Sequence, residues 1–239
     1  MDHPCSPEAF GLALARHFLM HHPLVSRAKV RVTLSPWVRA ATPAGPHAHG
    51  YEGGGGGNRF AVVLLGRNAP AATVIGGVKG WRVLKTTQSG YAGFTKDAWT
   101  ALPDVGDRIL ATSVSASWRY SRPVAYDGAY AAVIAAMAAA FFGPAGAGSF
   151  SPSAQFTLHE MGSAALASVP GIDSIALTLP NLHFLPCAPL GDGRGFEDDV
   201  YVATAEPHGV IEASMVREGV RAPHVELWGE DGLGPAARL

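Results

Sequence analysis

The sequence predicts an α+β fold made of two helix-backed antiparallel β-sheet units. Several segments alternate apolar with polar or small residues, which is typical of half-buried antiparallel strands. Two segments begin with serine and continue with apolar residues at helical spacing. A capped helix that leads through proline into an alternating strand occurs twice, over residues 6–34 and 153–179. This loose repeat predicts one unit at residues 1–80, a second at 81–218, and an irregular tail at 219–239.

Composition limits the classes of function that fit the chain. Of its 239 residues 48% are hydrophobic, and 18 lysines and arginines face 19 acids, which gives a net charge of -1. A nucleic-acid-binding protein usually has a basic excess. The longest apolar run, residues 129–143, is too short to cross a bilayer, and no signal pattern opens the sequence. We therefore expect a protein that binds neither nucleic acid nor membranes.

The cysteine count favours a reducing compartment. Cys5 and Cys187 lie far apart, and two such residues do not make the disulfide framework of a small secreted domain. They could form one disulfide, but the low count favours a reducing intracellular compartment.

The first predicted unit begins with a helix. Ser6 suits the N-cap, and Pro7 suits the first helical position, where its missing N–H is harmless. The helix is expected to end near His21, ahead of Pro23. Strands are then predicted at residues 28–34, 59–65 and 72–79.

A loop is expected between the first two of these strands. It contains His47 and His49, followed by a run of glycines at residues 53–57. The glycines lack the lysine and following helix of a phosphate-binding loop. No cysteine, glutamate or further histidine stands at useful spacing near the two histidines, so we expect no metal there.

The second predicted unit begins after Gly80 with strands at residues 81–87 and 108–120. The longer strand alternates regularly, with Leu110, Val114 and Trp118 on one face. A helix follows from Asp127, and a second helix is capped by Ser153. A last alternating strand is predicted at residues 210–216.

Polar residues end the strand that follows the second helix. Residues 175–179 alternate, so Asn181 and His183 are expected to project to one side, with Phe184 on the other. Pro180 has no N–H for a ladder and favours an edge or a bulge. The two side chains either form a site or are ordinary polar residues at a strand end, and this segment alone does not decide between them.

Two further residues suit an anionic ligand. Arg108 begins the long strand on the side of Leu110, where its guanidinium is placed either to grip a planar anion or to form a salt bridge at the rim. Gln155 lies in the first turn of the second helix, where backbone N–H groups are free and the helix dipole favours anions.

Several motifs together resemble the urate oxidase (uricase) family. They follow the family's order and approximate spacing from about Pro7 to about Val216, which is far more specific than one motif alone. They are Trp37-Val38-Arg39, Gly45-Pro46-His47-Ala48-His49, Lys85-Thr86-Thr87-Gln88-Ser89-Gly90-Tyr91-Ala92-Gly93-Phe94, Leu102-Pro103, Asp107-Arg108-Ile109-Leu110-Ala111-Thr112, Ser153-Ala154-Gln155 and Leu179-Pro180-Asn181-Leu182-His183-Phe184.

The resemblance implies the tunnelling fold, a homotetramer around a central tunnel, and active sites between subunits. It also implies the reaction, which is oxidation of urate by O₂ and water to 5-hydroxyisourate and hydrogen peroxide. Neither a metal nor an organic cofactor takes part in the family's reaction, so O₂ is the co-substrate.

The site residues implied by the resemblance divide into three groups. Arg108 and Gln155 would bind opposite edges of urate, and the Ala154 N–H would add a donor. Tyr91 would stack on the ring, although the family more often has phenylalanine there. Asn181 would hold water or O₂ over the ring, and His183 would belong to a proton relay.

The sequence also departs from the family pattern. Family members carry a strand pair with a catalytic lysine, and a threonine-aspartate-threonine segment, ahead of the first helix, and this sequence begins at Met1. Lys29 and Lys79 lie in other contexts. We therefore expect an incomplete first unit and little turnover by this chain alone, with a catalytically silent homologue that binds purines or co-assembles as the alternative.

The carboxy-terminus and one other enzyme class also bear on location and function. The chain ends in Ala237-Arg238-Leu239, a variant of the peroxisomal address that suits eukaryotic uricases, with the cytoplasm as the alternative. The pterin-making enzymes of the tunnelling fold are another candidate class. They use zinc, however, and only His47 and His49 are clustered here.

Overall fold

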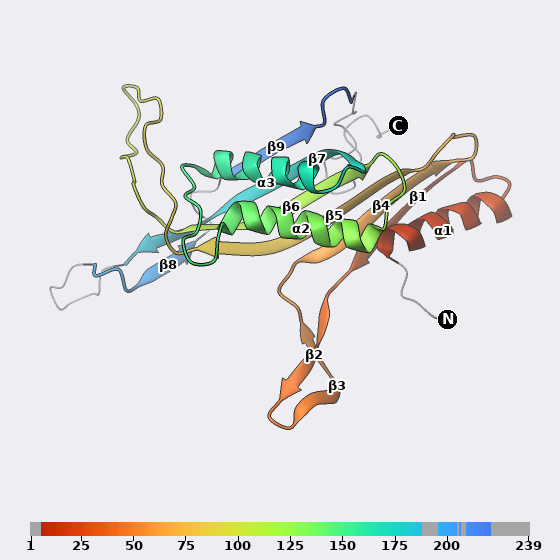
Figure 1. Ribbon diagram of the computed structural model, residues 1–239, viewed down its shortest axis with the longest axis horizontal. Coiled ribbons are helices and arrows are strands. Elements are labelled where there is room, and N and C mark those ends of the chain that lie inside the picture. The colour runs from red at the N-terminus through yellow and green to blue at the C-terminus, as the bar shows by residue number, and fades with distance from the viewer. Residues whose placement is uncertain (1–5, 188–195, 205, 207–208, 221–239) are drawn as a thin grey trace.

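The chain folds into a twisted antiparallel sheet with helices packed against one face (Figure 1). The computed structural model describes residues 6–187, 196–204, 206 and 209–220. Neighbouring strands follow the order β1-β4-β5-β6-β7, and both β8 and β9 pair with β7. The predicted α+β class is confirmed.

The elements have the following bounds. The helices are α1 (Pro7–His21), α2 (Tyr126–Phe142) and α3 (Ala154–Ser168). The strands are β1 (Arg27–Leu34), β2 (Trp37–Thr42), β3 (Gly45–Gly53), β4 (Asn58–Gly66), β5 (Thr73–Lys85), β6 (Leu110–Tyr120), β7 (Ile172–Pro186), β8 (Tyr201–Thr204) and β9 (Val210–Val216).

Helix α1 begins as the sequence predicts. The Ser6 hydroxyl accepts a hydrogen bond from the Ala9 N–H at 3.2 Å, and Pro7 occupies the start of the helix. Its buried positions include Gly11, Ala15 and Leu19, which pack on β1 and β4. Gly11 allows close approach, because a Cβ there would lie 2.9 Å from a methyl group of Val63.

A buried ionic network joins α1, β4 and α2. Arg59 donates to Glu8 at 2.8 Å and to Asp127 at 2.6 Å. Glu8 is fully buried, and this burial raises the pKa of its carboxyl, while the Arg59 charge acts in the opposite direction. The Arg59 guanidinium also lies 4.4 Å from the centroid of the Tyr130 ring. The network fixes both helices on the same face of the sheet.

The predicted loop at residues 45–57 is wrong over most of its length. Residues 45–53 form β3, which pairs with β2 in a two-stranded hairpin that projects from the main sheet (Figure 1). Both strands are exposed on both faces, including Trp37 and Tyr51. Without a buried face the segment lacks the apolar alternation from which a strand is predicted.

The two strands predicted on either side of Gly80 form one continuous strand, β5. Gly80 lies inside it with φ +76°, and the pairing with β6 shifts register between Val78 and Trp81. A glycine at positive φ accommodates this bulge. The proposed unit boundary therefore falls within a strand, and the division at residue 80 stays a prediction.

Strand β6 confirms the predicted alternation and carries the centre of the core. Trp118 and Val114 are fully buried against the helices, together with Met137 and Phe141 of α2. The serines of the other face are only partly buried. One helix-facing core thus spans the sheet from β1 to β7.

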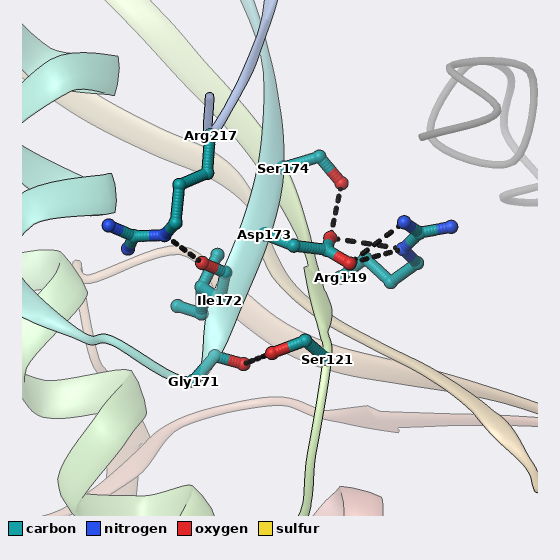
Figure 2. A network of polar contacts seen from close by, with 7 residues as sticks. All are labelled: Arg119, Ser121, Gly171, Ile172, Asp173, Ser174 and Arg217. Carbon is teal, nitrogen blue, oxygen red and sulfur yellow. Dashed lines mark hydrogen bonds and ion pairs between the residues drawn. The ribbon is translucent and has the colours of Figure 1, made fainter. Parts of the chain in front are cut away.

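A polar network closes one end of β6 and β7 (Figure 2). Arg119 donates through Nε and Nη2 to both carboxylate oxygens of Asp173, which also accepts a hydrogen bond from the Ser174 hydroxyl at 2.8 Å. Arg217, next to β9, donates to the Ile172 carbonyl at 3.2 Å. It also donates to the Leu166 carbonyl at 2.5 Å, and this bond anchors the carboxyl end of α3, where helix carbonyls lack partners.

Candidate active site

All six site residues predicted from the sequence line one cavity of about 270 Å³. The cavity lies at the end of β6 and β7 opposite to the Arg119 network, beside the first turn of α3. The predicted lining residues are Tyr91, Arg108, Ala154, Gln155, Asn181 and His183. These side chains come from four separate parts of the chain, so their convergence was not given by the sequence order.

Arg108 is the cation of this cavity. Its backbone N–H donates to the Ser89 carbonyl at 2.7 Å, which fixes the residue just ahead of β6. Among the described residues its guanidinium has no hydrogen-bond or ion-pair partner, and its Nε is buried. Burial lowers the pKa of this guanidinium, and the nearby Tyr91 acts in the opposite direction. A partly desolvated cation without a carboxylate is suited to an anionic ligand.

Tyr91 forms an aromatic wall beside Arg108. The Arg108 guanidinium lies 5.4 Å from the centroid of the Tyr91 ring. That ring stacks on Phe94 with centroids 4.6 Å apart and an interplanar angle of 16°. Two backbone hydrogen bonds between Tyr91 and Val105, of 2.7 and 2.9 Å, hold the wall in place. Its geometry allows a flat ligand to lie against a π surface.

The start of α3 supplies a second wall of the cavity. The Ser153 hydroxyl accepts from the Phe156 N–H at 3.1 Å, which confirms the predicted N-cap. Ala154 is buried, and the Gln155 side chain is exposed toward the cavity that it lines. The first N–H groups of a helix have no partner within the helix, and its dipole favours negative charge there.

Asn181 and His183 lie where β7 changes partner. Strand β9 pairs with β7 up to Pro180, and β8 pairs with it from His183 onward. Between them the Asn181 N–H donates to the Gly209 carbonyl at 2.8 Å. A Cβ on Gly209 would lie 2.9 Å from the Asn181 Nδ2, so the Asn181 amide packs closely against this glycine.

The expected bulge or sheet edge at Pro180 is wrong. Asn181 pairs with Thr112 and Thr178 pairs with Ser115 in one unbroken register, and Pro180 also pairs with Val210. The Pro180 carbonyl accepts a hydrogen bond from the Thr112 hydroxyl at 2.8 Å. The change of partner strand exposes the polar residues here, and no extra residue is needed.

Sequence reasoning missed the apolar part of the cavity. Leu102, Ile109 and Ile211 are among the apolar residues that line it, and nothing in their local patterns distinguishes them from core residues. It also missed a neighbouring cavity of about 390 Å³, which contains Arg82, Phe184 and again His183. His183 therefore lines both cavities.

The lining predicts what the cavity binds. Among the described residues that line it there is one guanidinium, one imidazole and no carboxylate. An amide, a helix start and an aromatic ring also belong to the lining. This set fits a flat anion whose edges both donate and accept hydrogen bonds. In the described part of the chain, groups of three metal-binding side chains are absent, and no helix reaches the length and apolarity of a membrane span.

Comparisons with known proteins agree on one family. A model of the uricase family matches residues 74–212. Uricase-2 isozyme 2 of Glycine max is 40% identical over 225 residues, which is 89% of this chain and 72% of that protein. The uricase of Arabidopsis thaliana is 37% identical over 226 residues, with the same coverage of both chains.

Solved structures agree with the fold. The crystal structure of uricase from Arthrobacter globiformis superposes with a TM-score of 0.81 at 33% identity, over 93% of this chain and 74% of that chain. A uricase from Bacillus fastidious matches with a TM-score of 0.69 at 18% identity, over 89% and 68% of the two chains, and supports the fold alone.

Proposed function

Because the chain belongs to the uricase family, we propose that its Arg108 cavity binds and oxidises urate. The protein is a urate oxidase, and its fold is the tunnelling fold of the uricases. The observation that carries the proposed site is the convergence of all six predicted residues on one cavity. The described residues offer nothing that favours the catalytically silent alternative.

Arg108 and the start of α3 determine how urate lies in the cavity. The Arg108 guanidinium forks onto one edge of the anion, and the anion takes the place of the carboxylate partner that the described residues do not supply. The Gln155 amide both donates and accepts, so it reads the other edge. The Ala154 N–H adds a donor at the positive end of the helix dipole. These contacts fix the plane and the direction of the ring.

Tyr91, Asn181 and His183 act on the faces of the ring. Tyr91 stacks on one face, supported from behind by Phe94. Asn181 projects its amide over the cavity, where it holds water or O₂. His183 lines the same cavity and passes protons, the commonest role of histidine in general acid–base catalysis.

The reaction balances without another reagent. Urate loses two electrons to O₂, water adds its oxygen to the ring, and the products are 5-hydroxyisourate and hydrogen peroxide. We propose that it proceeds with no metal or organic cofactor and that it serves purine breakdown. The proton relay that His183 serves has further members in the family, a lysine and a threonine, and no described residue is assigned to either role.

Assembly and location are further proposals. A homotetramer with sites between subunits is proposed from the family, and the cavity's position at the end of the sheet is compatible with a wall from a second subunit. We propose a peroxisomal location from Ala237-Arg238-Leu239, which lies outside the described residues.

A spectroscopic assay tests the proposed function. Purified protein is mixed with urate in air, while the ultraviolet absorbance of urate and the release of peroxide are recorded together. We expect one peroxide for each urate lost. Urate binding without turnover, measured in the absence of O₂, would favour the silent homologue. Neither binding nor turnover would contradict the assignment of the cavity.

A further inference from the structure

Lys85 is a buried cation outside the cavity that the proposed mechanism does not use. It ends β5, its exposed fraction is 8%, and burial lowers the pKa of its ammonium group. Nζ donates to the Ser149 carbonyl at 2.8 Å and to the Ser151 hydroxyl at 2.6 Å. It also lies 5.3 Å from the centroid of the Phe141 ring. Two hydrogen bonds and one cation–π contact thus surround the ammonium group.

The partners of Lys85 differ from those of the buried arginines. Arg59 and Arg119 are each paired with carboxylates. Among the described residues Lys85 has no carboxylate, and both of its hydrogen bonds go to one short segment of backbone and side chain. The buried position of Lys85 is therefore explained by residues 149–151 and by the structure that these residues contact.

The segment at residues 149–151 is fastened to the Tyr91 loop as well. The Ser151 N–H donates to the Gln88 carbonyl at 2.9 Å, and the Gly90 N–H donates to the Ser151 carbonyl at 2.9 Å. Gly90 has no spare room, since a Cβ there would lie 2.9 Å from the Val105 carbonyl oxygen. A displacement of Ser151 is therefore passed directly to the backbone beside it.

Both walls of the cavity directly follow the hydrogen bonds that join Ser151 to Gln88 and Gly90. Tyr91 follows Gly90 in the chain, and the Ser153 cap with Ala154 and Gln155 follows Ser151. On the same loop the Ser89 carbonyl accepts from the Arg108 N–H at 2.7 Å. Four of the proposed substrate contacts, Tyr91, Arg108, Ala154 and Gln155, are thus connected to the two hydrogen bonds of Lys85.

We propose that Lys85 is a positioning residue of the active site, which sets the separation between the Tyr91–Arg108 wall and the Ala154–Gln155 wall. This inference rests on the proposed function. Lys85 acts through Ser149 and Ser151 and does not touch the substrate.

The first test measures urate binding without O₂, so that no turnover occurs. Lys85→Met keeps the length of the side chain and removes the ammonium. We expect it to weaken urate binding about tenfold, because small displacements of binding groups are costly. Lys29→Met, an exposed change on β1, is the matched control and keeps wild-type affinity. Wild-type affinity in Lys85→Met would overturn the proposal.

A double-mutant cycle separates positioning from general stability. Gln155→Leu removes the amide that reads the substrate. If Lys85 aligns this amide, Gln155→Leu weakens binding in the wild-type chain by several times the factor that it produces in the Lys85→Met chain. Equal factors in both backgrounds would show that Lys85 only supports the fold, and would overturn the proposal.

A milder variant and a measurement without ligand complete the test. Ser151→Ala keeps Lys85 and removes one of its hydrogen bonds, and we expect it to weaken urate binding about threefold. If Lys85→Met does not fold, the double-mutant cycle is made with Ser151→Ala in its place.

Amide hydrogen exchange should rise at residues 88–91 and 149–155 in both variants and not in Lys29→Met. Unchanged exchange would contradict the positioning role. Failure of the wild-type chain to bind urate would contradict only the proposed function.

Discussion

Strand β6 has an arginine at each end, and the two differ in what faces them. Arg119 is 16% exposed and forms a two-pronged bond with Asp173, which also accepts from Ser174. Arg108 stands two residues before the strand and faces the cavity, with no such partner among the described residues. At one end the chain supplies the anion, and at the other end it leaves the anion to a ligand.

This difference separates a structural arginine from a binding one. A partly buried guanidinium is expensive to desolvate, so a fold normally provides a carboxylate for it. Arg59 follows this rule with Glu8 and Asp127, as Arg119 does with Asp173. Arg108 departs from it at the place where an aromatic ring, an amide and a helix start converge. The absence of a carboxylate partner among the described residues therefore identifies Arg108 as the anion-binding arginine.

The largest effect on stability is expected at Arg119, the arginine that is paired with Asp173. Arg119→Met leaves the Asp173 carboxylate nearly buried and without its cation, which should destabilise the fold by about 3 kcal/mol. Urea unfolding followed by circular dichroism measures the change. Urate affinity of the protein that remains folded should stay at the wild-type value. A large loss of affinity at unchanged stability would make Arg119 a functional residue and break the contrast.

A change at Arg108 should have the opposite result, with little effect on stability and a large effect on activity. Arg108→Met removes a cation that has no hydrogen-bond or ion-pair partner among the described residues, so the free energy of unfolding should change by less than about 1 kcal/mol. The value of kcat/KM for urate should fall at least about 100-fold, because the charge partner of the anion is lost. Steady-state assays and thermal unfolding of the same sample give both numbers. A strongly destabilised variant would place Arg108 with the structural arginines.

Glu8 sharpens the comparison through pH. Burial raises the pKa of Glu8 above its ordinary value of 4.5, so the folded state holds the proton more tightly than the unfolded state. The contribution of Glu8 to stability is therefore present below about pH 4.5 and is lost as pH rises through the folded pKa. The stability of Glu8→Gln relative to wild type should therefore rise as pH increases through that window. Urea midpoints measured at several pH values test this.

A control addresses the other partner of Arg59. Asp127→Asn removes the exposed carboxylate of the same network and should leave the pH dependence of stability nearly unchanged. If the difference between Glu8→Gln and wild type did not vary with pH, the direction of the Glu8 shift would be wrong.

Local signals predicted much of the fold. Ser6 and Ser153 cap the helices that the sequence places there, because a serine hydroxyl accepts a backbone N–H with little dependence on distant residues. The alternation of β6 follows from one buried face. The β2–β3 hairpin has no buried face, and the glycines of β5 interrupt its pattern, so these two elements were not predicted correctly.

The site was predicted through resemblance more than through pattern. Arg108 and Asn181 each had an ordinary structural explanation, and local sequence did not decide between the two readings. Their meaning depends on contacts between residues far apart in the chain, such as the carbonyl of Gly209 against Asn181. The bonds of Lys85 to Ser149 and Ser151 span 64 and 66 positions and leave no local trace.

The most direct test of the account compares urate binding by wild-type protein and Arg108→Met in the absence of O₂. Equilibrium dialysis gives both dissociation constants without interference from turnover. The account predicts saturable binding by the wild-type chain and at least about 100-fold weaker binding by the variant. Equal affinities would contradict it, since the unpaired guanidinium would then not be the anion site.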